Sequence, residues 1–123
     1  MAAEELVEAQ RLVREIPIAR HLSRYALDIA RARRLDRGAE GDVVPDFIRQ
    51  YVDWGAGPRA AQYLVLGAKA RAALDGRPTP SLDDVKAMAP PVLRHRLVTN
   101  FHAEAEGVGR DDLIAELVDA VRI

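Results

Sequence analysis

The spacing of apolar residues constrains this chain most, because it follows the helical period along most of the sequence. Alternating apolar and polar residues, which mark half-buried strands, are nearly absent. With so few strand signals, no parallel sheet can form. The pattern therefore predicts an all-α fold, a compact helical bundle with at most a small β element near residues 96–100.

Prolines and glycines divide the chain into its helical segments. The predicted helices cover about residues 3–15, 18–35, 46–52, 58–75 and 81–90, with a last helix after Gly109. Pro58 suits the first position of a helix, and Gly76 suits the residue after a last turn. Ser81 can cap the N–H of Asp84. The pair Pro90–Pro91 is expected to end or kink its helix.

The length of the chain corresponds to one domain, residues 1–123. A domain of this size buries roughly two-thirds of the surface of its unfolded chain, so one core suffices. The apolar stripes of four helices must pack against each other to form that core. We expect it to include Leu22, Tyr25, Ile29, Leu66, Val85, Met88, Val92, Leu117 and Val118.

Composition excludes several classes of protein. The chain has no cysteine, which excludes disulfides and thiolate metal sites and fits a cytoplasmic location. No apolar run of about 18 residues is present, so no membrane span is expected. The only serines are Ser23 and Ser81, and the histidines at 21, 95 and 102 lack the i, i+4 spacing of zinc sites. We therefore expect no catalytic residue and no metal site in this chain.

Arginines are concentrated between Arg20 and Arg37, although the net charge of the chain is −1. A nucleic-acid-binding stripe is one interpretation of this cluster. The solvated face of a helix is the interpretation we favour, because a duplex-binding domain usually carries a basic balance overall. No nucleic-acid partner is expected. The members of the cluster are Arg20, Arg24, Arg31, Arg33, Arg34 and Arg37.

One short turn contains residues that are suited to contact a phosphate. Gly55, Gly57 and Pro58 precede Arg59 and Ala60 at the start of the long predicted helix. The free N–H groups and dipole of a helix N-terminus attract anions, and an arginine adds a forked donor suited to phosphate oxygens. The turn alone is weak evidence, since such junctions are common. The sequence also lacks a G-x-x-x-x-G-K-[ST] phosphate loop, so we expect no nucleotide hydrolysis by this chain alone.

The residues around this turn resemble the C-terminal lid domain of MoxR-family AAA+ ATPases. The family typically carries a W/L-G-A-S-P-R-A turn before an alanine-rich helix, and residues 51–70 here read YVDWGAGPRAAQYLVLGAKA. Residues 6–34 resemble the first two helices of that lid. The similarity continues through residues 74–77, 81–97 and 100–107. One departure is Gly57, which stands where the family usually has serine and removes a possible hydroxyl cap.

The resemblance implies a function that the residues alone do not. It implies that Arg59 is the sensor 2 arginine, which reaches the γ-phosphate of ATP bound to a separate AAA+ core domain. ATP and Mg²⁺ would then be cofactors of the full-length parent only. The implied role is chaperone-like assembly or activation. The implied partners are the parent's own core, neighbouring subunits of a ring, and a von Willebrand factor A-domain protein.

Three other interpretations stay open at this point. A free-standing helical interaction module would make Arg59 an ordinary surface residue. A helix-turn-helix DNA binder could carry the turn between Trp54 and Pro58, but the near-neutral charge and the alanine-rich helix face disfavour it. An independent enzyme is disfavoured because nucleophiles and metal ligands are lacking.

Overall fold

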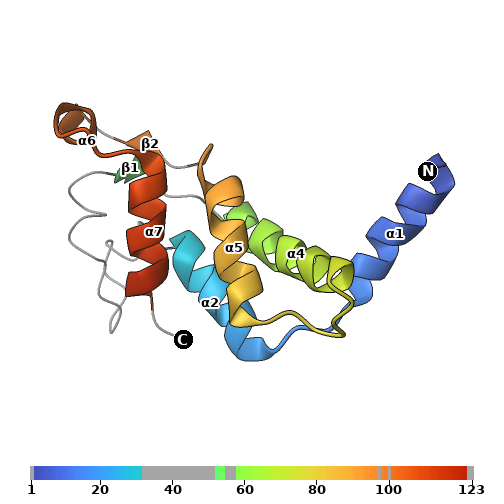
Figure 1. Ribbon diagram of the computed structural model, residues 1–123. Helices are drawn as coiled ribbons and strands as arrows, with labels where there is room; N and C mark the ends of the chain where they lie inside the picture. The colour runs from blue at the N-terminus through green and yellow to red at the C-terminus, as the bar shows by residue number, and fades with distance from the viewer. Residues whose placement is uncertain (1, 32–51, 55–57, 97, 100, 122–123) are drawn as a thin grey trace.

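The computed structural model describes residues 2–31, 52–54, 58–96, 98–99 and 101–121 of the chain (Figure 1). Helices dominate these residues, so the all-α prediction is confirmed. A small two-stranded sheet pairs β1 with β2 in antiparallel orientation, with Val52 opposite Thr99. The elements in chain order are α1 (Ala3–Glu15), α2 (Arg20–Arg31), β1 (Val52–Trp54), α4 (Pro58–Leu74), α5 (Leu82–Leu93), β2 (Val98–Thr99), α6 (Phe101–Ala105) and α7 (Arg110–Ala120).

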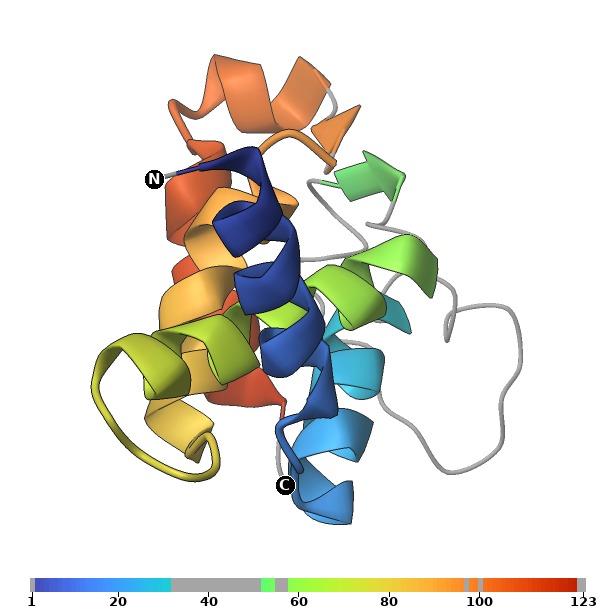
Figure 2. The same cartoon turned by 90° about the vertical axis from the view of Figure 1, so that its right-hand side faces the viewer.

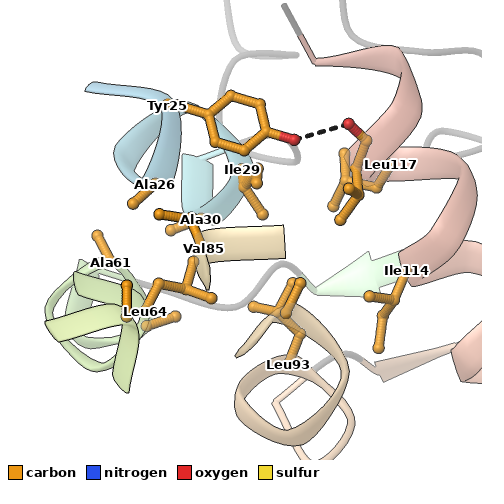
Figure 3. Packing of buried hydrophobic residues seen from close by; sticks show 14 of the residues in the cluster. Tyr25, Ala26, Ile29, Ala30, Ala61, Leu64, Val85, Leu93, Ile114 and Leu117 are labelled. Atoms are coloured by element: carbon orange, nitrogen blue, oxygen red, sulfur yellow. Dashed lines mark hydrogen bonds between the residues drawn. The ribbon is translucent and has the colours of Figure 1, made fainter. Parts of the chain in front are cut away.

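The core lies where α2, α4, α5 and α7 meet (Figure 3). The apolar stripe of α2 is buried as predicted, and so is the stripe of α7. On α4 the buried residues are mostly alanines that recur about every four residues, together with Leu64. Small side chains let helices approach closely. Gly67 illustrates this approach, because an added Cβ would lie 2.5 Å from Cε of Met88 on α5.

The predicted core needs one correction. Leu22, Tyr25, Ile29, Val85, Leu117 and Val118 are buried, as predicted. Met88 and Val92 are half-buried and pack against the rim of the core. Leu66 is only half-buried, and the fully buried leucine of α4 is Leu64. The physical reason is the period of α4: Ala60, Leu64 and Ala68 share one face, and Leu66 points elsewhere.

Tyr25 links α2 to α7 through its polar end. Its hydroxyl donates a hydrogen bond of 2.7 Å to the main-chain oxygen of Val118, drawn as the dashed line in Figure 3. Burial of the ring and the nearby charge of Asp119 raise the pKa of Tyr25 to about 12. The hydroxyl therefore stays protonated and keeps its role as a donor at neutral pH.

The connection from α4 to α5 follows the sequence signals closely. Gly76 adopts a φ of +71°, the left-handed conformation expected after a last helical turn. The N–H of Gly76 bonds to the oxygen of Ala73, and the N–H of Arg77 bonds to that of Ala72. Ser81 is the N-cap residue of α5. The N–H of Asp84 donates a hydrogen bond to the main-chain oxygen of Ser81, at 3.1 Å.

The helix was expected to end or kink at Pro90–Pro91, and the predicted end there is wrong. Helix α5 continues through both prolines to Leu93, and the N–H of Arg94 still bonds to the oxygen of Pro90 at 3.0 Å. Leu93 is fully buried. Its packing in the core compensates for the main-chain hydrogen bonds that two prolines cannot make.

Other boundaries differ in smaller ways. Helix α1 has the predicted bounds, whereas α2 begins at Arg20, and residues 32–35 of its predicted range lie outside the described residues. The predicted helix over 46–52 falls outside them too, except that Val52 is in a strand. The short helix α6 was not expected. Among the described helices, none has the length and apolar character that crossing a membrane requires.

Candidate nucleotide-contacting site

The N-terminus of α4 is the place where the sequence predicted a phosphate contact. Helix α4 begins at Pro58, as predicted. Strand β1 ends at Trp54, which pairs with Val98 of β2. The two ends of the glycine turn are thus attached to different parts of the fold, β1 to the small sheet and α4 to the core. Gly55 and Gly57 themselves lie outside the described residues.

Arg59 and Ala60 are adjacent in the first turn of α4 but have opposite surroundings. Arg59 is exposed. Ala60 is fully buried in the core. Its burial fixes the rotation of the first turn, and Arg59 is therefore directed outward. Any role of Ala60 at a nucleotide is indirect, through the orientation that it gives to α4.

No carboxylate in the described part of the chain lies within ion-pair distance of Arg59. The other arginines near α4 have partners of their own. The guanidinium of Arg96 lies 4.7 Å from the ring centroid of Tyr63, which ties the end of α5 to α4. Arg71 and Arg77 bond to Asp84. Arg59 is thus exposed, without an ion-pair partner among the described side chains.

Asp84 was expected only as the residue whose N–H Ser81 caps, and the burial and ion pairing of its side chain were not foreseen from the sequence. Its side chain is 2% exposed and accepts hydrogen bonds from Arg77 at 2.6 and 2.7 Å and from the N–H of Ser81 at 2.7 Å. These bonds, chiefly those from Arg77, hold the pKa of Asp84 well below its usual range. The pair Ser81–Asp84 has the spacing of a capping box, and that spacing was the available signal. The cluster stabilises the start of α5.

The remaining candidates show little chemistry. Within the ranges that the structure describes, no three His, Asp or Glu side chains gather where they could hold a metal ion. Arg20, Arg24 and Arg31 are exposed on α2, whereas the other arginines of that cluster lie outside the described residues.

A strand, β1, stands directly before the turn at Trp54–Pro58. A helix-turn-helix motif needs a helix there, so that interpretation is wrong.

Comparison with known proteins identifies the class. The AAA lid domain model matches residues 47–117. The chain therefore belongs to the AAA lid domain family, in the MoxR group of AAA+ ATPases.

The relatives agree in fold and sequence. The protein MoxR of Paracoccus denitrificans is 33% identical over 99 residues, and the chaperone MoxR1 of Mycobacterium tuberculosis is 32% identical over 76 residues. These matches cover 80% and 62% of this chain. A crystal structure of a candidate ATPase from Cytophaga hutchinsonii superimposes with a TM-score of 0.77 at 28% identity and covers 90% of this chain.

The chain is much shorter than these relatives. It spans 28% of the Paracoccus protein, 20% of MoxR1 and 32% of the Cytophaga chain. The similarity therefore concerns one domain of each relative, and activities of the remaining parts are not transferred by it.

Proposed function

We propose that this lid contributes Arg59 as the sensor 2 residue of a MoxR-type ATPase. The observation that supports the proposal best is the contrast in the first turn of α4, where Ala60 is locked in the core while Arg59 is exposed without a described ion-pair partner. An arginine that only stabilised this domain would have a carboxylate nearby, as Arg77 has.

The chemistry of Arg59 suits a phosphate. A guanidinium keeps its charge at all physiological pH values and presents paired N–H donors that match phosphate oxygens. The positive end of the α4 dipole lies beside it and favours the same negative charge. Arg59 would donate to the γ-phosphate of ATP held mainly by the parent's core. The residues of this chain fit one phosphate contact, and Mg²⁺ would be held by residues outside it.

Domain movement follows from this contact. A lid that is drawn toward ATP through Arg59, and released after hydrolysis, couples the state of the nucleotide to the position of the whole helical domain. The packing of α4 against α2 and α5 lets the domain move as one unit. The parent would be a ring-forming, chaperone-like ATPase, in keeping with its similarity to the chaperone MoxR1. A von Willebrand factor A-domain partner and a cytoplasmic location stay predictions.

The proposal is tested by nucleotide selectivity in the full-length parent. Only ATP carries the γ-phosphate, so Arg59→Ala should weaken the binding of ATP and leave that of ADP unchanged. A charge-assisted hydrogen bond contributes about 1.5–3 kcal/mol, which corresponds to a loss of roughly tenfold or more in ATP affinity. Calorimetric titration with both nucleotides measures this difference.

Arg110 provides the matched control, because it is also an exposed arginine in the first turn of a helix, α7. Arg110→Ala should change neither affinity. If Arg59→Ala behaved like Arg110→Ala, the sensor role would be refuted, and a free-standing interaction module would become the better interpretation. The reading frame gives a simpler check, since a parent ATPase must encode a phosphate loop upstream of this lid.

A further inference from the structure

The side chains of α4 and α5 meet in reverse order along the two helices. The meeting pairs, from the far end of α4 toward its start, are Arg71 with Asp84, Gly67 with Met88, and Tyr63 with Arg96. The two helices are therefore antiparallel, and the end of α5 lies beside the first turns of α4. Strand β2 follows α5 and pairs with β1, which precedes α4, so the small sheet lies at the same end of the domain (Figures 1 and 2).

Two arginines at the end of α5 have different partners. Arg94 pairs with Asp111 of α7, at 2.8 Å between Nε and Oδ1. The guanidinium of Arg96 instead lies 4.7 Å from the ring centroid of Tyr63, and no carboxylate of the described residues is within ion-pair distance of it. Stacking on an aromatic face is a favourable contact for a guanidinium. The contact therefore joins α4 to the segment that leads into β2.

Tyr63 stands on the same side of α4 as Arg59. Residues four positions apart in a helix are neighbours on its surface, and both of these side chains are exposed. Helical side chains also lean toward the N-terminus, so the ring of Tyr63 lies over the turn that carries Arg59. Ala60 holds that turn from the core side, and the contact between Tyr63 and Arg96 holds it from the exposed side.

The first turn of a helix needs such support, because its N–H groups lack partners within the helix. We propose that Tyr63 and Arg96 are positioning residues for Arg59. Their contact keeps the first two turns of α4 in the orientation from which Arg59 reaches the γ-phosphate. The inference rests on the proposed sensor role of Arg59 and adds two residues that act through it, without touching the nucleotide themselves.

Calorimetric titration of the full-length parent with ATP and with ADP tests the positioning. Tyr63→Leu and Arg96→Ala should each weaken the binding of ATP about two- to fivefold, which corresponds to the strength of a partly exposed cation–π contact. The binding of ADP should not change, because ADP lacks the phosphate that Arg59 contacts. Tyr63→Phe keeps the ring and should bind both nucleotides like the wild type. Equal losses for ATP and ADP would indicate a general loss of packing and would overturn the proposal.

Arg94→Ala is the matched control, because Arg94 lies two residues before Arg96 but pairs with α7. It should change the affinity for neither nucleotide. A loss of ATP affinity as large as that of Arg96→Ala would show that any arginine at the end of α5 has this effect, and would contradict the positioning.

A double variant shows whether Tyr63 acts through Arg59. In an Arg59→Ala background, Tyr63→Leu should cause no further loss of ATP affinity, since the group that it positions is gone. An additive loss would overturn the proposal. If Arg59→Ala weakened the binding of ATP and Tyr63→Leu did not, the positioning would be refuted and the sensor role would stand.

The isolated chain provides a test without nucleotide. NMR relaxation of the main-chain N–H of Arg59 should give a lower order parameter in Tyr63→Leu and in Arg96→Ala than in the wild type. Tyr63→Phe should match the wild type. An unchanged order parameter in both loosened variants would overturn the positioning, whatever the outcome for the sensor role.

Discussion

Replacing Asp84 with asparagine tests how the start of α5 is stabilised. The change keeps the volume of the side chain but removes its charge and turns one acceptor into a donor. In the folded chain this carboxylate receives two hydrogen bonds from Arg77, one from Arg71 at 3.2 Å and two from Ser81. An amide nitrogen facing the guanidinium of Arg77 would leave buried donors unpaired.

The size of the effect follows from the burial of the two partners. Removing one partner of a buried ion pair costs about 3–5 kcal/mol. Asp84 is buried, but the side chain of Arg77 is 35% exposed and is partly screened by water. We therefore expect Asp84→Asn to lower the free energy of unfolding by about 2–3 kcal/mol. Urea unfolding followed by far-UV circular dichroism at neutral pH measures it.

Asp75→Asn is the matched control, because Asp75 also bonds to Arg77, at 2.7 Å, but is exposed. It should change the free energy of unfolding by less than about 1 kcal/mol, as exposed pairs do. The reasoning would be refuted if Asp84→Asn cost no more than Asp75→Asn.

The same ion pair predicts a pH dependence. The pKa of Asp84 is lowered in the folded chain, chiefly by its hydrogen bonds from Arg77, and is about 3.9 when the chain is unfolded. A lowered folded pKa means that the stabilisation is fully present above about pH 4 and is lost as the pH falls further. The difference in unfolding free energy between wild type and Asp84→Asn should therefore shrink below about pH 4. A difference that grew on acidification would contradict this assignment.

Three further outcomes are expected. Leu64→Ala should cost about 2–4 kcal/mol of unfolding free energy, whereas Leu66→Ala should cost clearly less, and equal losses in urea titrations would contradict the assigned face of α4. Gly76→Ala should cost about 1–2 kcal/mol by the same assay, because alanine is strained at a φ of +71°, and a neutral result would count against the turn geometry. The isolated chain should show no ATP turnover and no micromolar ATP binding by calorimetry, since most phosphate contacts would belong to the parent's core.

The helices with strong amphipathic stripes were predictable from the sequence. The stripes of α2 and α7 are buried as the 3.6-residue period requires, and Gly76 and Ser81 mark ends that local chemistry determines. The buried face of α4 was harder to predict, because apolar residues occur on all sides of that helix. The helical period alone therefore does not show whether Leu64 or Leu66 is buried. Alanines carry much of its buried face, and their small size gives a weak signal.

Features that depend on tertiary contacts were not predictable. The burial of Leu93 keeps α5 helical through Pro90 and Pro91, and local rules for proline cannot include that contact. Strand β1 exists because β2, more than forty positions later in the chain, pairs with it. From its position in the first turn of a helix, Asp84 would be expected to be exposed. Only the folded chain brings Arg71 and Arg77 around its side chain.

Turnover of the full-length ATPase tests the central claim most directly. Arg59→Ala in the parent should lower kcat by roughly a hundredfold or more, because a preorganised contact to the developing phosphate charge is lost. The same change in the isolated lid should leave its unfolding free energy within about 0.5 kcal/mol, as expected for an exposed residue without a described partner. Unchanged turnover in the parent would contradict the account, and so would a marked loss of stability in the isolated lid.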